Sequence, residues 1–126
     1  MRAFNAPISN RNNRMTFAEN LKGEEKDTMS NTFEKTLILG YRGMVGSAIV
    51  RRMADQGLPK PVLAGRQQLD CLDQASVRRY ISELKPTSVI VAAAKVGGIE
   101  ANRTQMSEFM YENLTLATNV IEASFR

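Results

Sequence analysis

The sequence predicts an α/β fold built around a parallel sheet. Short apolar runs of strand length occur at 36–39, 61–64 and 88–94, and they have the continuous hydrophobicity of strands buried on both faces. Segments in which apolar residues recur with helical spacing separate these runs and follow the last of them. The resulting order, β-α-β-α-β-α, implies right-handed crossovers between parallel strands.

The composition limits the chemistry that this chain can perform. Its 126 residues suit one domain, and no apolar run approaches the roughly 18 residues that a membrane span needs. The chain has no histidine and one cysteine, which excludes Ser-His-Asp and Cys-His catalysis, disulfide scaffolds and cysteine zinc sites. A formal net charge of +4 suits a small anionic ligand and is too weak and scattered to indicate nucleic acid. We therefore expect no metal, membrane or nucleic-acid partner.

Residues 1–33 differ from the rest of the chain. They contain six asparagines, few aliphatic side chains and no regular hydrophobic period, which predicts a disordered or loosely attached leader before a domain over 34–126. Three arginines and no acidic residue in the first 18 positions resemble an organelle transit peptide, whereas the missing amphipathic face favours an inert extension. Because no secretion signal is present, we expect a cytoplasmic protein.

The first strand and helix have the clearest boundaries. The apolar run at 36–39 is followed by a helix over 47–54. Gly57 and then Pro59 end this helix in the order that is usual after a helix C-terminus. We expect its inward face to carry Val45, Ile49 and Met53.

The second strand, at 61–64, leads into a second helix. Asp73 is suited to cap the N-terminus of that helix, which extends to about Leu84 and is stopped by Pro86. The expected inward face carries Val77, Ile81 and Leu84.

The third strand, at 88–94, is followed by a loop with glycines and a last helix from about Ser107 to the end. The expected inward face of that helix has 4-3-4-3 spacing and carries Met110, Leu114, Ala117, Ile121 and Ser124. In the doubly wound order the first strand of this half lies at an edge, with its other side left for a fourth strand. We expect such an apolar edge to make the chain marginally stable and prone to association.

The turn between the first strand and the first helix has the spacing Gly-x-x-Gly-x-x-Gly. A helix N-terminus presents free N–H groups and a partial positive charge to a phosphate. A side chain at Gly43 would keep the backbone away from a pyrophosphate, and one at Gly46 would push the helix off the strand. The turn lacks the Gly-Lys-Ser/Thr ending of a P-loop. It predicts the N-terminal half of a doubly wound, Rossmann-like NAD(P)-binding domain; glycines that serve packing alone are the alternative.

The end of the second strand indicates which dinucleotide binds. NAD-preferring sites place an acidic residue there to bond the ribose hydroxyls, whereas this chain has Arg66 followed by two glutamines. Arg66 and Arg42 can clamp a 2′-phosphate through charge-assisted hydrogen bonds. We therefore expect NADP (NADPH) in preference to NAD; two ordinary solvated arginines are the alternative.

Two segments resemble a known enzyme family. Residues 40–49 resemble the extended short-chain dehydrogenase/reductases, and Ala-Ala-Ala-Lys-Val-Gly-Gly-Ile at 92–99 resembles their GDP-L-fucose synthase group. Residues 66–73 and 111–121 also match, so the resemblance covers about 35–126. It implies an NADPH-dependent 3,5-epimerase/4-reductase that acts on the nucleotide sugar GDP-4-keto-6-deoxymannose and forms a homodimer.

The resemblance implies three groups of cofactor-binding residues. The first group holds the pyrophosphate and comprises Gly40, Tyr41, Arg42, Gly43, Met44, Val45 and Gly46. The second lines the adenosine 2′-phosphate end and comprises Arg66, Gln67, Gln68, Leu69, Asp70 and Cys71. The third belongs to the loop that borders the cofactor and the substrate and comprises Ala92, Ala93 and Ala94.

We predict no catalytic residue in this chain. The family uses a tyrosine as general acid/base with a lysine four residues later, and none of the three tyrosines (Tyr41, Tyr80 and Tyr111) has that lysine. Tyr41 also stands where the family usually has a histidine. The family's catalytic residues would lie beyond Arg126. Because Arg126 itself falls inside a helical pattern without a stop signal, we expect a truncated and inactive N-terminal part. The alternatives are a non-catalytic dinucleotide-binding module and another nucleotide-sugar epimerase/dehydratase relative.

Overall fold

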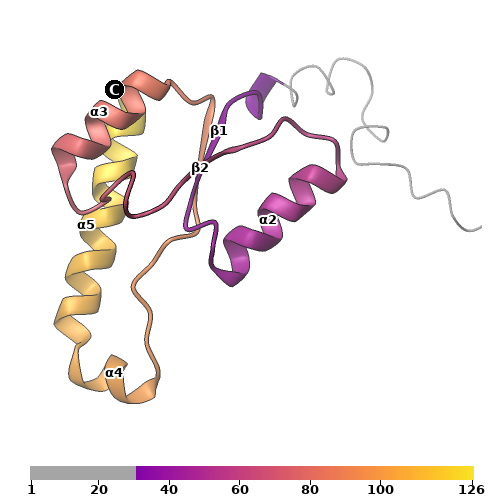
Figure 1. The fold of residues 1–126 in the computed structure, drawn as a ribbon. Helices are drawn as coiled ribbons and strands as arrows, with labels where there is room; N and C mark the ends of the chain where they lie inside the picture. The colour runs from indigo at the N-terminus through magenta and orange to yellow at the C-terminus, as the bar shows by residue number, and fades with distance from the viewer. Residues whose placement is uncertain (1–30) are drawn as a thin grey trace, which may run out of the picture.

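The computed structural model describes residues 31–126, except for the side chain of Asn102. Its elements follow the predicted alternation, with one additional short helix before the last (Figure 1). In chain order they are β1 (Thr36–Leu39), α2 (Met44–Asp55), β2 (Val62–Ala64), α3 (Gln74–Leu84), β3 (Ser88–Val91), α4 (Ile99–Thr104) and α5 (Met106–Phe125). The leader predicted over 1–33 lies outside the described residues apart from its last three positions, and its disorder stays a prediction.

The three strands form a parallel sheet in the order β2-β1-β3. Leu37 pairs with Val62 on one side and with Val89 on the other. All four residues of β1 are buried, so the prediction that this strand lies at an edge is wrong. Residues 65–72 form turns and irregular backbone, not a strand. The next strand, β3, takes the place beside β1 that the doubly wound order gives to its fourth strand, and residues 65–72 occupy the chain position of its third strand.

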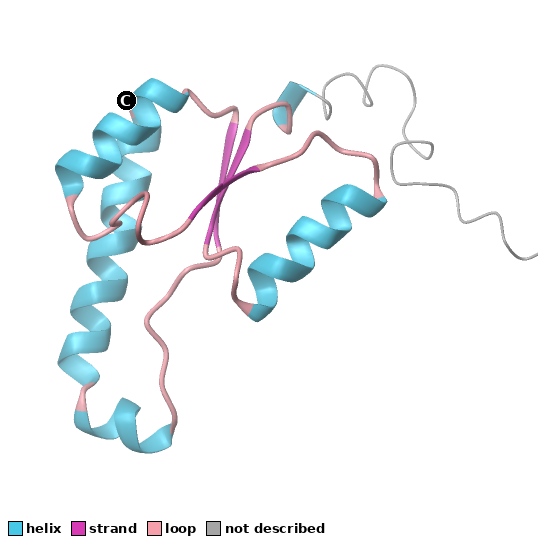
Figure 2. Ribbon diagram, viewed as in Figure 1, coloured by secondary structure: helices cyan, strands magenta, loops and turns pink. Residues whose placement is uncertain are grey.

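Helices cover both faces of this sheet. α2 lies on one face, and α3 and α5 lie side by side in contact on the other (Figures 1 and 2). The connection through α2 joins β1 to β2 across one face, whereas the connection through α3 runs from β2 past β1 to β3 across the other, so the strand order reverses between β1 and β3. Open α/β sheets bind ligands outside the carboxyl ends of their strands at such a switch point. The topology therefore places the candidate site at the ends of β1 and β3.

The predicted helix boundaries of α2 and α3 are confirmed. Gly57 ends α2 with φ +67°, the conformation that favours glycine. Asp73 caps α3 and accepts a hydrogen bond from the Ala75 backbone N–H. The predicted inward face of α2 is wrong at one position, since Val45 is 58% exposed and Gly46 is buried instead. The first turn of α2 packs on the glycine turn through its glycine and not through valine.

α5 buries a different face from the predicted one. Met110, Leu114 and Ile121 are each at least 60% exposed. The buried side carries Asn119, Val120 and Ala123, and it packs on α3 and the sheet. This buried face includes a hydrogen-bonded amide: the Asn119 Nδ2 donates to the backbone oxygens of Cys71 (3.0 Å) and Leu72 (3.3 Å). A hydrophobic period does not register such buried, hydrogen-bonded amides.

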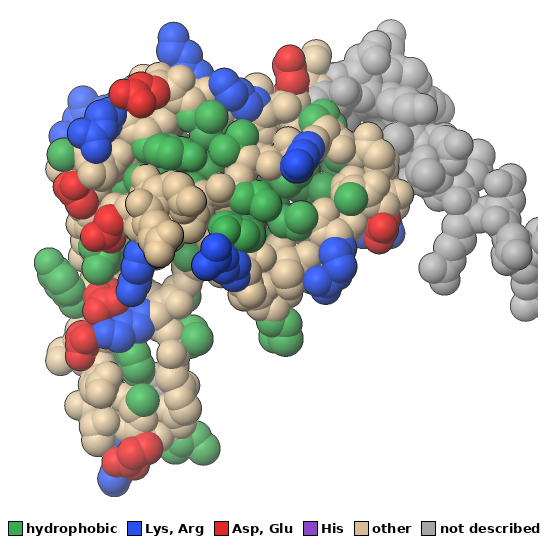
Figure 3. Space-filling view, viewed as in Figure 1, with side chains coloured by type: hydrophobic (Ala, Val, Ile, Leu, Met, Phe, Trp, Pro, Cys, Tyr) green, Lys and Arg blue, Asp and Glu red, His purple; other side chains and the backbone are tan. Residues whose placement is uncertain are grey.

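The hydrophobic core lies between the sheet and the α3–α5 layer. It comprises Leu37, Leu39, Ala64, Leu69, Val77, Ile81, Val120 and Ala123. α4 and the beginning of α5 project from this core as an arm, as the space-filling view shows (Figure 3). In the part of the chain that the structure describes, none of the helices has the length and apolar character of a membrane span.

Candidate dinucleotide-binding site

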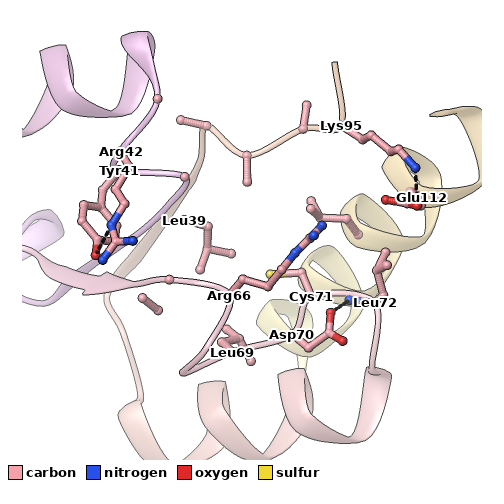
Figure 4. Close-up of a pocket in the computed structure, with 18 of the residues that line it drawn as sticks. Leu39, Tyr41, Arg42, Arg66, Leu69, Asp70, Cys71, Leu72, Lys95 and Glu112 are labelled. Carbon is pink, nitrogen blue, oxygen red and sulfur yellow. Dashed lines mark hydrogen bonds and ion pairs between the residues drawn. The ribbon is translucent and has the colours of Figure 1, made fainter. Parts of the chain in front are cut away.

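A pocket of about 390 Å³ opens at the carboxyl ends of the three strands (Figure 4). Five stretches of the chain line it: the end of β1 with the glycine turn, the end of β2, the turn before α3, the loop after β3, and the middle of α5. The pocket thus lies at the switch point of the sheet, where the topology places a ligand site.

Backbone atoms pack closely on the glycine-turn side of the pocket. Gly40 has φ +80°, and a Cβ there would lie 2.5 Å from the Ala93 nitrogen and 2.6 Å from the Ala92 carbonyl carbon. A Cβ on Gly46 would lie 2.2 Å from the Gly40 oxygen, so its predicted role in helix–strand packing is confirmed. At Gly43 a Cβ would meet the Gly40 oxygen at an ordinary 3.4 Å. The turn therefore needs glycine for packing at Gly40 and Gly46, whereas a Cβ at Gly43 would make an ordinary van der Waals contact.

The N-terminus of α2 is suited to an anion. Gly43 is the N-cap residue, no side chain caps this end, and the first turn contains no acidic residue. The partial positive charge of the helix end is therefore not offset by a carboxylate of its own first turn. Backbone N–H groups in this setting bind phosphate.

The two arginines of the predicted 2′-phosphate clamp both line the pocket. The Arg42 Nε donates to the Tyr41 hydroxyl at 3.1 Å, and its guanidinium carbon lies 5.4 Å from the centre of the Tyr41 ring. Arg66 points the other way, across the pocket toward Lys95 and α5 (Figure 4). In this arrangement the two guanidinium groups do not converge, so a shared clamp requires one of the side chains to rotate.

The turn between β2 and α3 is held by its own side chains. The Gln68 Oε1 accepts a hydrogen bond from the Gly65 N–H (3.0 Å), and the Asp70 Oδ1 accepts one from the Leu72 N–H (3.0 Å). Burial, reinforced by the neighbouring Asp70 charge, raises the pKa of the half-buried Cys71 thiol. This cysteine is therefore protonated at neutral pH, as expected of a packing residue.

α5 fixes the opposite wall of the pocket. The Asn113 side chain accepts from the Lys95 backbone N–H (2.7 Å) and donates to the Lys95 carbonyl (2.9 Å). The Lys95 ammonium pairs with Glu108 and with Glu112, the second at 2.7 Å. Hydrogen bonds to these two carboxylates raise the pKa of Lys95. The loop after β3 is thereby tied to α5 through both its backbone and its side chain.

Most of the predicted cofactor-binding residues meet in this pocket. Those that line it are Gly40, Tyr41, Arg42, Gly43, Arg66, Leu69, Asp70, Cys71, Ala92, Ala93 and Ala94. Those outside its lining are Met44, Val45, Gly46, Gln67 and Gln68. Four side chains that complete the wall were not among the predicted cofactor-binding residues, namely Lys95, Glu112, Asn113 and Leu116. Lys95 lies in the matching segment 92–99, and the other three lie in the matching segment 111–121, where the wrong inward face of α5 concealed them.

Comparison with known proteins gives consistent results. The chain is 46% identical to GDP-L-fucose synthase 1 of Arabidopsis thaliana over 103 residues, which are 82% of this chain and 32% of the relative. It is 48% identical to a GDP-L-fucose synthase of Sinorhizobium fredii over 71% of this chain and 28% of the relative. The chain thus spans about a third of the length of these relatives.

A solved structure with NADP bound shares this fold. It is the GDP-mannoheptose C4 reductase MlghC of Campylobacter jejuni, which matches with a TM-score of 0.69 and 38% identity over 75% of this chain and 30% of the reductase. The model of the NAD dependent epimerase/dehydratase family matches residues 36–126. The chain, with its glycine turn, switch-point pocket and β2-β1-β3 sheet, belongs to the NAD dependent epimerase/dehydratase family.

Proposed function

We propose that this chain is the cofactor-binding part of an NADPH-dependent epimerase/reductase that makes GDP-L-fucose from GDP-4-keto-6-deoxymannose. Similarity to GDP-L-fucose synthases and to an NADP-bound GDP-sugar reductase supports the proposal. Because the chain spans about a third of those relatives, the nucleotide-sugar substrate belongs to the proposal. So do the homodimer and the cytoplasmic location.

The observation that carries the proposal is the construction of the pocket at the switch point. Backbone of the glycine turn lies against backbone of the loop after β3, with no side chain between them at Gly40. The N-terminus of α2, without an acidic residue in its first turn, lies beside this contact. We assign the pyrophosphate to the residues from Gly40 to Gly46, and the adenosine to the pocket bordered by Cys71 and Ala93.

The preference for NADPH rests on charge at the end of β2. Gly65 and Arg66 follow that strand where NAD-preferring sites place an acidic residue. Arg66 and Arg42 line the same pocket, and each can donate charge-assisted hydrogen bonds to a 2′-phosphate. A bound nicotinamide supplies the hydride in such enzymes. The 126 residues contain no Tyr-x-x-x-Lys pair, so we propose that they bind the cofactor without turnover.

Calorimetric titration of residues 1–126 with NADPH and NADH tests this proposal. We expect NADPH to bind at least about tenfold more tightly, because a charge-assisted contact contributes about 1.5–3 kcal/mol. Arg66→Ala should reduce this preference. Arg51→Ala, which removes the same charge from the exposed side of α2, should not. Equal affinity would overturn the NADPH preference, and no binding of either dinucleotide would overturn the site.

A separate assay tests the claim about turnover. NADPH is mixed with the protein and GDP-4-keto-6-deoxymannose, and its absorbance is followed. We expect no oxidation above the rate without protein, and measurable oxidation would contradict the assignment of a binding role alone.

A further inference from the structure

We infer that Tyr41 sets the preference for a 2′-phosphorylated dinucleotide by holding Arg42 at the end of β2. The inference rests on the proposed function and adds to it a positioning residue that does not itself contact the 2′-phosphate. It begins from two contacts between these neighbouring side chains.

Tyr41 holds Arg42 through its hydroxyl and through its ring. The hydroxyl accepts the Arg42 Nε–H at 3.1 Å, and the guanidinium lies over the ring at 5.4 Å from its centre. Guanidinium carries five N–H donors in a fixed plane. Because the Nε–H is the one engaged by Tyr41, the N–H groups of the two terminal nitrogens remain to donate to an anion.

The ring also fixes where this charge lies. A Cβ built on Gly65 would be 3.8 Å from both the Tyr41 Cε1 and the Tyr41 hydroxyl oxygen, so the ring borders the backbone that follows β2. In this fold, residues at this position contact the 2′ substituent of the adenosine ribose of a bound dinucleotide. Tyr41 therefore spans from the glycine turn to the end of β2, with the Arg42 guanidinium against its ring (Figure 4).

Holding Arg42 in this place favours phosphate binding for an entropic reason. Arginine loses substantial rotamer freedom when it is ordered, and a residue that is ordered before binding loses less of it on binding. The benefit applies to ligands that contact Arg42, which means those with a 2′-phosphate. A purely structural role of Tyr41 would affect ligands with and without that phosphate alike.

Two adenosine nucleotides serve as probes, because the pocket lies at the adenosine end of the proposed site. Adenosine 2′,5′-bisphosphate carries the 2′-phosphate, and adenosine 5′-monophosphate lacks it. Both are titrated by calorimetry into residues 1–126.

Tyr41→Phe keeps the ring and removes the hydrogen bond. It should lower the preference for the bisphosphate about threefold, while the affinity for the monophosphate stays within about twofold. Tyr41→Ala removes both contacts and should lower the preference about tenfold. Tyr111→Phe, an exposed tyrosine on α5, is the matched control.

A double-mutant cycle decides whether Tyr41 acts through Arg42. In an Arg42→Ala background, Tyr41→Phe should have no further effect on the preference. An effect that persists without Arg42, a loss shared equally by both probes, or no effect of Tyr41→Phe would each overturn the inference. If Arg42→Ala abolishes the preference and Tyr41→Phe leaves it intact, the inference fails and the proposed function stands. A wild-type chain with no preference for the bisphosphate overturns both.

Discussion

The two walls of the pocket are built by different means. On the side of β1 and α2, backbone packs on backbone, and glycine is required at Gly40 and Gly46 because a Cβ would lie under 3 Å from other atoms. On the side of α5, asparagine side chains hold the other wall together: Asn119 is hydrogen-bonded to the turn before α3, and Asn113 to the loop after β3. Close packing that excludes a side chain is visible in the sequence as glycine spacing. An asparagine in a helix gives no such signal, because its hydrogen-bond partners are known only from the structure.

The largest expected effect comes from the backbone-packed wall. Gly46→Ala places a Cβ 2.2 Å from the Gly40 oxygen, and neither backbone can move without disturbing β1 or α2. We expect a loss of at least about 4 kcal/mol in the free energy of unfolding, measured with urea. Gly98→Ala is the control, because nothing lies within 4 Å of its Cβ position; since Gly98 is the N-cap residue of the short helix α4, this variant should lose no more than about 1 kcal/mol. Equal stabilities for the two variants would show that the close packing is absent.

The second prediction tests which face of α5 is buried by comparing two isoleucines. Ile81 on α3 is 5% exposed and belongs to the core beneath α5, whereas Ile121 of the predicted inward face is 68% exposed. Ile81→Ala should cost about 3 kcal/mol in urea unfolding. Ile121→Ala should change the free energy of unfolding by less than about 0.5 kcal/mol. A large loss from Ile121→Ala would mean that this stripe is covered in solution, as the sequence pattern predicts.

The third prediction removes an amide from the polar wall. Asn119→Ala leaves the Cys71 and Leu72 carbonyls without the donor they have in the structure, so we expect a loss of about 2 kcal/mol. Thr118→Ala changes the exposed neighbour on the same helix and should not destabilise the protein. If the two alanine variants unfold at the same urea concentration, Asn119 does not hold the turn.

The smallest effect is a pH dependence from the link between α3 and α5. Glu122 accepts two hydrogen bonds of 2.8 Å from Arg78 and pairs with Arg126. The Arg78 bonds first, and then Arg126, lower the pKa of Glu122 from 4.5 to about 2. Because the folded pKa is below the unfolded one, this contribution is complete above about pH 4.5 and is lost as the pH falls through 2. Exposure of these side chains keeps it small.

Urea unfolding at several pH values measures that contribution. The difference in stability between the parent and Glu122→Gln should be constant from pH 7 to 5, shrink below pH 4.5, and vanish below pH 2. Glu83→Gln, an exposed change on α3, controls for the loss of one negative charge. A difference that grows as the pH falls would contradict the assigned pKa direction.

The parallel α/β fold and the packing role of Gly46 were predicted correctly from the sequence. Thr36–Leu39 and the cap at Asp73 are where the pattern places them, because short-range hydrophobicity and capping chemistry determine both. The position of β1 within the sheet was predicted wrongly, since it depends on which edge the third strand joins after the connection through α3, and the local hydrophobic pattern does not determine that. The short helix α4 was missed, because a six-residue segment gives too little periodicity to detect. The buried face of α5 depends on contacts with residues far away in sequence.

The contact of Gly40 with Ala92 and Ala93 has a consequence for laboratory evolution of this site. At this contact main chain lies against main chain, and a side chain added at Gly40 would collide with it. Variation of ligand preference is therefore better directed to side chains that line the pocket away from this contact, such as Tyr41, Arg42 and Arg66. A library restricted to these three positions would sample ligand preference while the scaffold stays constant, whereas randomising Gly40 or Gly46 would place side chains where backbone already lies.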